Sequence, residues 1–247
     1  MLSPEEKERY ARQILVPEIG EVGQEILSAK RVLVVGAGGL GTPCTSYLAG
    51  AGVGHIGLLD SDEVSLSNLP RQIMYDMNDL GKRKADVLSR KLSAANPLIR
   101  IEPITEKLTE ENVHSIVRGF DVVASCVDNL ETRYILNEAC VRAGIPMVEG
   151  AVYGFTGLVT VILPGRGPCY ECIFPKRPQL EKKPVGVAGP SPGVIGSIQA
   201  AETLKLLLGK GQPLAGRLVL IDLLTASFQT IVVAKNPECR VCRNMGR

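Results

Sequence analysis

The feature that most constrains the fold is an apolar run ending in closely spaced glycines, RVLVVGAGGLG, from Arg31 to Gly41. Its apolar part predicts a buried strand, because β-branched residues pack well in a sheet covered on both faces. Gly36, Gly38 and Gly41 follow the G-x-G-x-x-G pattern, in which a strand turns into a helix beneath a phosphate group. The stretch therefore predicts a Rossmann-like α/β unit that binds a phosphorylated ligand.

The segments around this motif alternate between strand and helix patterns. We expect strands over residues 31–35, 55–60, 98–104, 121–126 and 145–150, and helices over about 40–50, 81–97, 106–118 and 130–143. Ser3, Pro4 and Glu6 predict a capped helix at the N-terminus. This order is typical of a doubly wound, mostly parallel sheet with short connections.

From about residue 150 the pattern changes. Residues 157–164, 216–222 and 227–234 predict antiparallel strands, and residues 194–208 predict one long helix. Between them, residues 174–193 are rich in Pro, Gly and Lys and are typical of a long flexible loop. We therefore expect antiparallel C-terminal strands to extend the parallel sheet.

Composition excludes several classes of protein. The chain has 28 basic and 26 acidic residues, 4% aromatic residues and no tryptophan, so neither charge nor stacking side chains favour nucleic acid. No apolar stretch reaches the ~20 residues of a membrane helix, and the charged N-terminus is unlike a signal peptide. We expect a cytoplasmic protein that binds neither nucleic acid nor membrane. Two histidines make a histidine-based triad improbable.

The glycine pattern alone leaves two classes of ligand open. Asp60 ends the second strand about 20 residues after the glycines, where an acidic residue binds a ribose hydroxyl in dinucleotide enzymes. Taken alone, this spacing favours a nicotinamide cofactor. Arg71 and Lys84 favour ATP, because cationic side chains stabilise the charge that develops when the α-phosphate is attacked. Asp128 follows another strand and can hold Mg²⁺.

Two C-x-x-C pairs, CYEC and CRVC, predict a metal site. They contain Cys169 and Cys172, then Cys239 and Cys242. Four thiolates complete the tetrahedral shell of Zn²⁺ and leave no open position, so the zinc is expected to be structural. A redox function remains the alternative for either pair alone.

Several motifs together resemble one family. RYARQI, VGAGGLG, SLSNLPRQ, GKRKAD, CVDN and CYEC…CRVC occur in this order from about residue 5 to 242. They resemble the ubiquitin-activating-enzyme-like adenylyltransferases of the MoeB/ThiF/HesA family, most closely its MoeB-like members. The resemblance implies one domain over residues 1–247. A helical segment (1–28) precedes a Rossmann-like ATP-binding part (29–150) and a mixed-sheet part (151–247) that binds the carrier and zinc and contains a flexible loop at about 175–190.

The resemblance also implies the site residues. Those expected to bind ATP are Gly36, Gly38, Gly39, Gly41, Asp60, Ser67, Asn68, Arg71, Gln72, Lys84, Asp128 and Asn129. Arg71, Lys84 and Asp128 are also implied as catalytic, the last with Mg²⁺, together with Arg12 supplied by the neighbouring subunit of a homodimer. Pro70 stands where close relatives usually carry Gln, which removes a backbone donor beside the phosphates.

The implied reaction is ATP-dependent adenylation of the C-terminal glycine of a small ubiquitin-fold sulfur-carrier protein ending in Gly-Gly, for molybdopterin or thiamine biosynthesis. A carboxylate is already ionised at neutral pH and needs no general base, which agrees with the shortage of histidines. Residues 189–196, GPSPGVIG, are expected to suit passage of the Gly-Gly tail. The long loop lacks cysteine, so a separate sulfurtransferase or cysteine desulfurase is expected to supply sulfur.

Alternative functions remain at this point. One is a nicotinamide-dependent oxidoreductase, and another is a zinc-stabilised scaffold that binds a nucleotide without chemistry. A third, an ATP-dependent tRNA-modifying dehydratase of the same fold, is disfavoured by the balanced charge and the two cysteine pairs.

Overall fold

The computed structural model describes residues 1–175 and 186–244 of the chain. Most of the expected flexible loop at about 175–190, including Lys182 and Lys183, lies outside these described residues.

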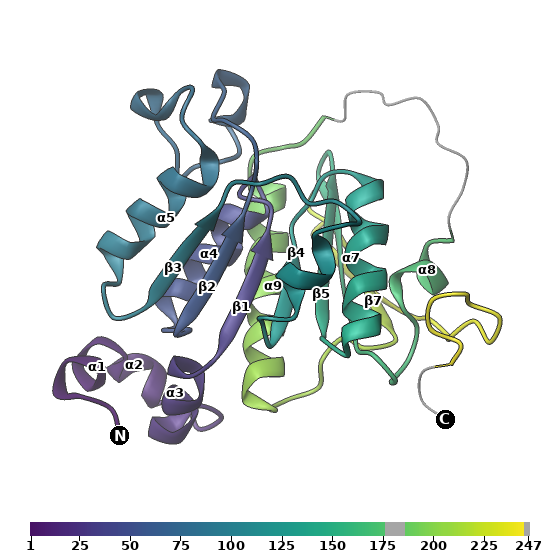
Figure 1. Ribbon diagram of the computed structural model, residues 1–247, viewed down its shortest axis with the longest axis horizontal. Helices are drawn as coiled ribbons and strands as arrows, with labels where there is room; N and C mark the ends of the chain where they lie inside the picture. Colours follow the sequence, from purple (N-terminus) through teal and green to yellow (C-terminus); the bar gives the residue numbers. More distant parts are fainter. Residues whose placement is uncertain (176–185, 245–247) are drawn as a thin grey trace.

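The centre of the molecule is an eight-stranded sheet with the order β3-β2-β1-β4-β5-β6-β7-β8 (Figure 1). The first five strands in this order are parallel, and the last three join them antiparallel. The expected doubly wound sheet with antiparallel C-terminal strands is therefore confirmed. The strands are β1 (Arg31–Val35), β2 (His55–Leu59), β3 (Arg100–Ile104), β4 (Val122–Ser125), β5 (Met147–Tyr153), β6 (Thr156–Ile162), β7 (Arg217–Asp222) and β8 (Ser227–Val232).

Helices cover both faces of the parallel part. One face packs against α3 (Gly20–Ser28), α4 (Gly41–Gly50), α5 (Lys84–Ala95) and α9 (Pro190–Leu208). The other packs against α6 (Val113–Val117), α7 (Leu130–Ala143) and α8 (Tyr170–Ile173). Side chains of β1 alternate between these two cores: Val32 and Val34 enter the first, and Leu33 and Val35 enter the second. A strand buried on both faces reads as the continuous apolar run seen in the sequence.

The N-terminal segment forms α1 (Pro4–Arg9) and α2 (Ala11–Ile14) ahead of α3. The predicted cap of α1 is confirmed. The Glu6 amide donates to Ser3 Oγ at 3.2 Å, and the Ser3 amide donates to Glu6 Oε2 at 2.7 Å. This reciprocal capping box satisfies amides that have no partner within the helix.

Two expected elements have different boundaries. The helix predicted over 106–118 is wrong in its first half, because α6 covers only Val113–Val117. Asn112 Oδ1 accepts from the Thr109 amide and its Nδ2 donates to the Lys107 carbonyl, so local side-chain bonds replace helical ones. The long helix starts at Pro190 rather than 194, since proline fits a first helical turn. Residues 190–196 therefore form the first turns of α9.

Within the described ranges, no helix combines the length and the apolar character that crossing a membrane requires.

Candidate functional site

The predicted site residues meet at the carboxyl ends of β1 and β4. The chain order reverses between these neighbouring strands, since β1 pairs with β2 on one side and β4 on the other. Open α/β sheets bind ligands at such a switch point. Here the glycine turn follows β1, and Asp128 follows β4. The two segments touch, because a Cβ built on Gly36 would lie 2.6 Å from the Cys126 carbonyl oxygen.

The turn itself requires glycine at two positions. Gly36 has φ +100°, in the region that favours glycine. A Cβ on Gly41 would lie 1.7 Å from the Gly36 oxygen, so no side chain fits where the turn enters α4. Gly38 and Gly39 face other segments: their Cβ positions lie 3.5 Å from Gln72 Nε2 and 3.0 Å from Pro192 Cβ. Residues 68–72 and the start of α9 therefore enclose the glycine turn.

Asp60 fixes this turn from β2. Its Oδ2 accepts from the Ala37 amide at 2.7 Å and its Oδ1 accepts from the Asp62 amide at 2.8 Å. Burial raises the pKa of Asp60, against the opposing effect of Lys84 and of the two amides. Each carboxylate oxygen retains acceptor capacity for a ligand hydroxyl. The acidic residue is thus beside the turn, as predicted.

Lys84 begins α5, and its side chain is buried in the same region. Its Nζ lies 3.0 Å from Asp62 Oδ2, and its amide donates to the Asp62 carbonyl at 3.0 Å. The Tyr75 hydroxyl joins Lys84 to the turn, because it lies 2.7 Å from the Ala37 oxygen and 3.3 Å from the Lys84 oxygen. Sequence reasoning missed Asp62, although the stretch DSDE places it two residues after Asp60.

The segment SNLPRQ lies over the turn. Arg71 Nη1 donates to the Ser67 carbonyl at 2.8 Å, and Asn68 Oδ1 accepts from the Ser65 amide at 3.2 Å. Gln72 is buried, and its Oε1 accepts no hydrogen bond from any described residue. Such an atom fits a ligand that donates a hydrogen bond.

Pro70 contacts its surroundings through its carbonyl group. A Cβ on Gly189 would lie 2.6 Å from the Pro70 oxygen, so the loop packs tightly on the start of α9. The missing backbone donor of proline is not part of this contact.

Asp128 and Asn129 follow β4, whose end touches the glycine turn at Cys126. Asp128 is exposed, whereas Asn129 caps α7 by accepting from the Thr132 amide at 2.9 Å. A single exposed carboxylate at this place fits Mg²⁺, which proteins bind through one or two carboxylates plus substrate phosphates.

Near Asp128 the structure contains a buried ion pair, Arg133 with Glu149, that the sequence analysis did not predict. The sequence feature that could have predicted this pair is that Arg133 and Glu149 are charged residues next to apolar ones.

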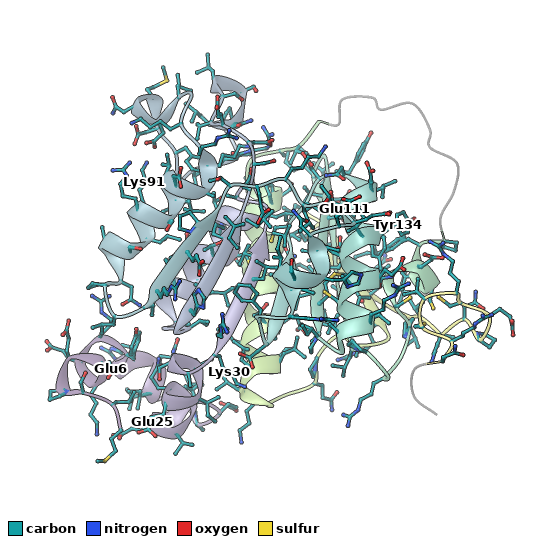
Figure 2. All side chains as sticks on the ribbon, viewed as in Figure 1. Glu6, Glu25, Lys30, Lys91, Glu111 and Tyr134 are labelled. Carbon is teal, nitrogen blue, oxygen red and sulfur yellow. The ribbon has the colours of Figure 1, made fainter. Side chains whose placement is uncertain are left out.

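Among the residues predicted to act at the nucleotide, Arg12 lies far from the glycine turn of its own chain. It is exposed on α2, and its neighbour Gln13 donates to the Ala51 carbonyl, at the carboxyl end of α4. The glycine turn is at the other end of this ten-residue helix, about 15 Å away. Figure 2 shows Glu6 on the adjacent α1 and Lys30 before β1 at this same amino-terminal end of the strands.

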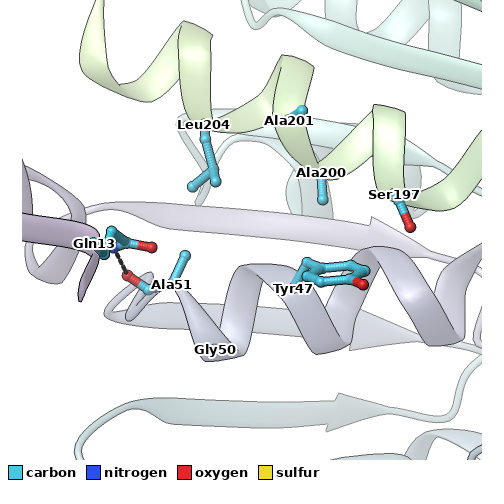
Figure 3. A pocket seen from close by; sticks show the side chains of 8 residues that line it. All are labelled: Gln13, Tyr47, Gly50, Ala51, Ser197, Ala200, Ala201 and Leu204. Atoms are coloured by element: carbon cyan, nitrogen blue, oxygen red, sulfur yellow. Dashed lines mark hydrogen bonds between the residues drawn. The ribbon is translucent and has the colours of Figure 1, made fainter. Parts of the chain in front are cut away.

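A surface depression of about 300 Å³ lies beside α2 (Figure 3). Its walls come from α4 and α9 and include Tyr47, Ser197 and Leu204, and Gln13 closes one end. The Tyr47 side chain is large and 60% exposed.

The two cysteine pairs come together away from the crevice. Cys169 Sγ lies 3.8 Å from Cys172 Sγ and 3.6 Å from Cys239 Sγ, and Cys172 Sγ lies 3.5 Å from Cys242 Sγ. Tetrahedral Zn²⁺ with Zn–S bonds of ~2.3 Å requires sulfur atoms about 3.8 Å apart. The four sulfurs, all within 4.8 Å of one another, therefore fit a zinc site.

The protein alone does not favour the ionised form of all four thiols in the cluster. Burial raises the pKa of Cys242 to about 11 and that of Cys169 still further above its usual range. Burial opposes ionisation of Cys239 as well, but hydrogen bonds from the amides of Cys242 and Val241 and from the thiols of Cys169 and Cys172 together lower its pKa. Thiolates are the form that binds metal, so binding of a cation must release protons here.

Comparison with known proteins identifies the family. Residues 10–241 match the ThiF family, and the chain belongs to that family. It is 49% identical to the sulfur carrier protein adenylyltransferase of Thermus thermophilus, covering 96% of this chain and 91% of the relative. It is 44% identical to the SAMP-activating enzyme E1 of Haloferax volcanii, covering 97% and 90%. The adenylyltransferase and sulfurtransferase MOCS3 of Dictyostelium discoideum is 42% identical, and the chain spans 58% of its length. The predicted family is confirmed.

Solved structures agree on the fold. The chain superposes with a TM-score of 0.86 on E. coli MccB with ATP, at 24% identity, covering 98% of this chain and 77% of MccB. E. coli MccB with MccA-N7isoASN gives a TM-score of 0.88.

Proposed function

We propose that this protein is an ATP-dependent adenylyltransferase that activates the C-terminal glycine of a small ubiquitin-fold sulfur carrier, forming an acyl-adenylate and pyrophosphate. One observation carries the proposal: direct contacts join the glycine turn to Asp60, to the Lys84–Asp62 pair and to the segment SNLPRQ, and Asp128 follows the neighbouring strand β4. The 49% identical relative is named a sulfur carrier protein adenylyltransferase, which supports this substrate class. A nicotinamide-dependent enzyme does not require cationic side chains such as Arg71 and Lys84 near the glycine turn.

Each part of the crevice has a proposed role. The glycines let phosphates approach the amides of the turn, and Asp60 accepts from the ribose hydroxyls. Arg71 and Lys84 stabilise the phosphate charge, with Lys84 leaving Asp62 for the ligand. Ser67, Asn68, Gln72 and Asn129 complete the polar lining. Bound Mg²⁺, held by Asp128, would neutralise charge on the phosphates.

The chain's own residues then act mainly by positioning. The carrier carboxylate attacks the α-phosphorus while pyrophosphate departs, and no protein group needs to remove a proton. This explains how the site works without a histidine.

We place the carrier on the antiparallel end of the sheet. A groove of about 460 Å³ lies over β5 to β8, lined partly by Leu158 and Leu220, and the Tyr153 beside it is 69% exposed. Residues 186–192 run from the edge of this groove, at Gly154, to the glycine turn, at Gly39. The Gly154 amide donates to the Gly186 carbonyl at 2.8 Å, and Pro192 packs on Gly39. A Gly-Gly tail following this segment would reach the α-phosphate.

The first experiment is the exchange of labelled pyrophosphate into ATP. Exchange is expected only with a carrier that ends in Gly-Gly, because reversal of adenylation requires the acyl-adenylate. The matched control is the same carrier without its two terminal glycines. Tight ATP binding with no exchange for any carrier would favour a non-catalytic scaffold instead.

We propose that the enzyme is a homodimer in which Arg12 acts at the partner's nucleotide. Within one chain Arg12 is separated from the crevice by the length of α4, and the hollow beside Tyr47 offers an apolar contact surface. A two-fold dimer repeats the same contact in both directions.

Mixing two inactive variants tests this arrangement. Arg12→Ala and Asp128→Asn are each expected to be inactive, but each mixed dimer contains one complete site. Random re-association should restore about a quarter of the wild-type exchange rate. If both residues act within one chain, mixing restores nothing. Each variant mixed with itself is the control.

A separate sulfur donor and a cytoplasmic location complete the proposal. All seven cysteines are in the described part of the chain, and each is a free thiol there. The three outside the cluster, Cys44, Cys126 and Cys140, are buried, and burial raises the pKa of Cys140 to about 12. None of the three is suited to receive the acyl group.

A further inference from the structure

One buried hydroxyl joins two parts of the nucleotide site that come from distant segments. Tyr75 is 5% exposed, and its hydroxyl oxygen lies 2.7 Å from the Ala37 carbonyl oxygen and 3.3 Å from that of Lys84. Its single proton is donated mainly to Ala37, the nearer acceptor. Ala37 lies inside the glycine turn, and Lys84 is the first residue of α5. The hydroxyl therefore holds the glycine turn and the start of α5 together.

Ala37 is held through both of its backbone groups. Its amide donates to Asp60 Oδ2 at 2.7 Å, and its carbonyl accepts from Tyr75. Burial, together with the charges of Asp60 and Asp79, raises the pKa of Tyr75 above its usual range. The hydroxyl thus stays protonated and remains a donor. The two anchors fix the peptide groups on both sides of Ala37.

Lys91 fixes the loop that carries Tyr75. It lies on α5, where Figure 2 labels it. Its Nζ donates to the Met74 carbonyl at 2.8 Å and to Asp76 Oδ2 at 2.9 Å, on either side of Tyr75. It also pairs with Asp79, whose side chain is 3% exposed. Removal of one partner of such a buried pair is costly, so the pair holds the loop on α5.

We propose that Tyr75 is a positioning residue that fixes the glycine turn relative to Lys84, and that Lys91 keeps Tyr75 in place. The role of the turn and of Lys84 in ATP binding rests on the proposed function, but the structural link does not. Both groups are proposed to contact the phosphates of one ATP molecule, so a shift of either weakens the contacts that depend on their spacing.

Tyr75→Phe tests the link, with Tyr134→Phe as the matched control. Both changes keep the ring and remove a hydroxyl that donates to a backbone carbonyl, since Tyr134 donates to the Phe174 carbonyl at 3.0 Å. Tyr75→Phe is expected to raise hydrogen exchange of residues 36–42 about tenfold, because the Ala37 carbonyl loses this donor in a buried place. Tyr134→Phe should leave exchange there unchanged. Equal exchange of these residues in the two variants would overturn the proposal.

Binding of Mg·ATP in the absence of a carrier gives a measurement that a purely structural role would not change. Tyr75→Phe should weaken this binding about tenfold, the effect of one lost hydrogen bond, whereas Tyr134→Phe should bind as the wild type does. A Tyr75→Phe protein that loses thermal stability but binds ATP with wild-type affinity would refute the positioning role.

Lys91→Gln provides a second test, because it removes the cation that holds the loop and keeps the Tyr75 hydroxyl. ATP binding should again weaken about tenfold. The double variant with Tyr75→Phe should bind ATP little worse than Tyr75→Phe alone, since both changes break one link. Full additivity of the two losses would show that Lys91 does not act through Tyr75 and would overturn that part of the assignment.

Failure of the proposed function gives a different pattern of results. If the wild type binds no ATP, the proposed function fails, while hydrogen exchange of residues 36–42 still decides the structural link. If the wild type binds ATP and Tyr75→Phe changes neither exchange nor affinity, the link fails and the proposed function stands.

Discussion

Asp128→Asn is expected to lower carrier-dependent pyrophosphate exchange by about 1,000-fold and to leave the fold intact. The amide keeps the size of the carboxylate but lacks the charge that holds Mg²⁺ against the phosphates, and removal of one preorganised charge-stabilising group costs on this order in kcat. Asp128 is exposed, so the thermal midpoint should stay within about 2 °C of the wild type. Exchange rate and thermal unfolding are measured on the same preparation.

Glu131→Gln is the matched control. Glu131 is exposed in the first turn of α7, three residues after Asp128, and the change removes the same charge. Its exchange rate should remain near that of the wild type. If the two variants lose activity equally, the loss comes from the change in electrostatic potential near the nucleotide site, and the assignment of Asp128 to Mg²⁺ is wrong.

Cys239→Ala is expected to lose bound zinc and thermal stability together. Three thiolates cannot complete the tetrahedral shell, and structural zinc sites can contribute on the order of 10 kcal/mol to apparent folding free energy. At about 2–4 °C per kcal/mol for a chain of this size, the thermal midpoint should fall by 10 °C or more. Zinc is measured per chain after gel filtration, and unfolding is followed with and without chelator.

Cys140→Ala separates the metal from the loss of a buried sulfur. Cys140 and Cys239 are both buried, but Cys140 lies on α7 outside the cluster. This control should keep one zinc per chain and remain sensitive to chelator. Retention of zinc and of the wild-type midpoint by Cys239→Ala would refute the zinc site.

Local sequence patterns predicted the secondary structure well where they carried strong signals. The run Val32–Val35 is a strand buried on both faces, and the Ser3–Glu6 cap forms as expected. Patterns failed where side chains competed with the backbone, as Asn112 does before α6, and where a proline began a helix earlier than its apolar residues suggested.

By itself, the sequence determined the family, the glycine turn and the two cysteine pairs, because each depends on residue type at short spacing, and it predicted the residues of the candidate nucleotide site. Only the tertiary structure decided which distant residues meet. The pairs Lys84–Asp62 and Arg133–Glu149, the contact of Pro192 with Gly39, and the distance of Arg12 from its own crevice depend on how strands and helices stack. The physical reason is that these contacts join segments far apart in the chain. Hydrophobic periodicity indicates local secondary structure only, so the packing of the sheet against its two helical layers determines these contacts.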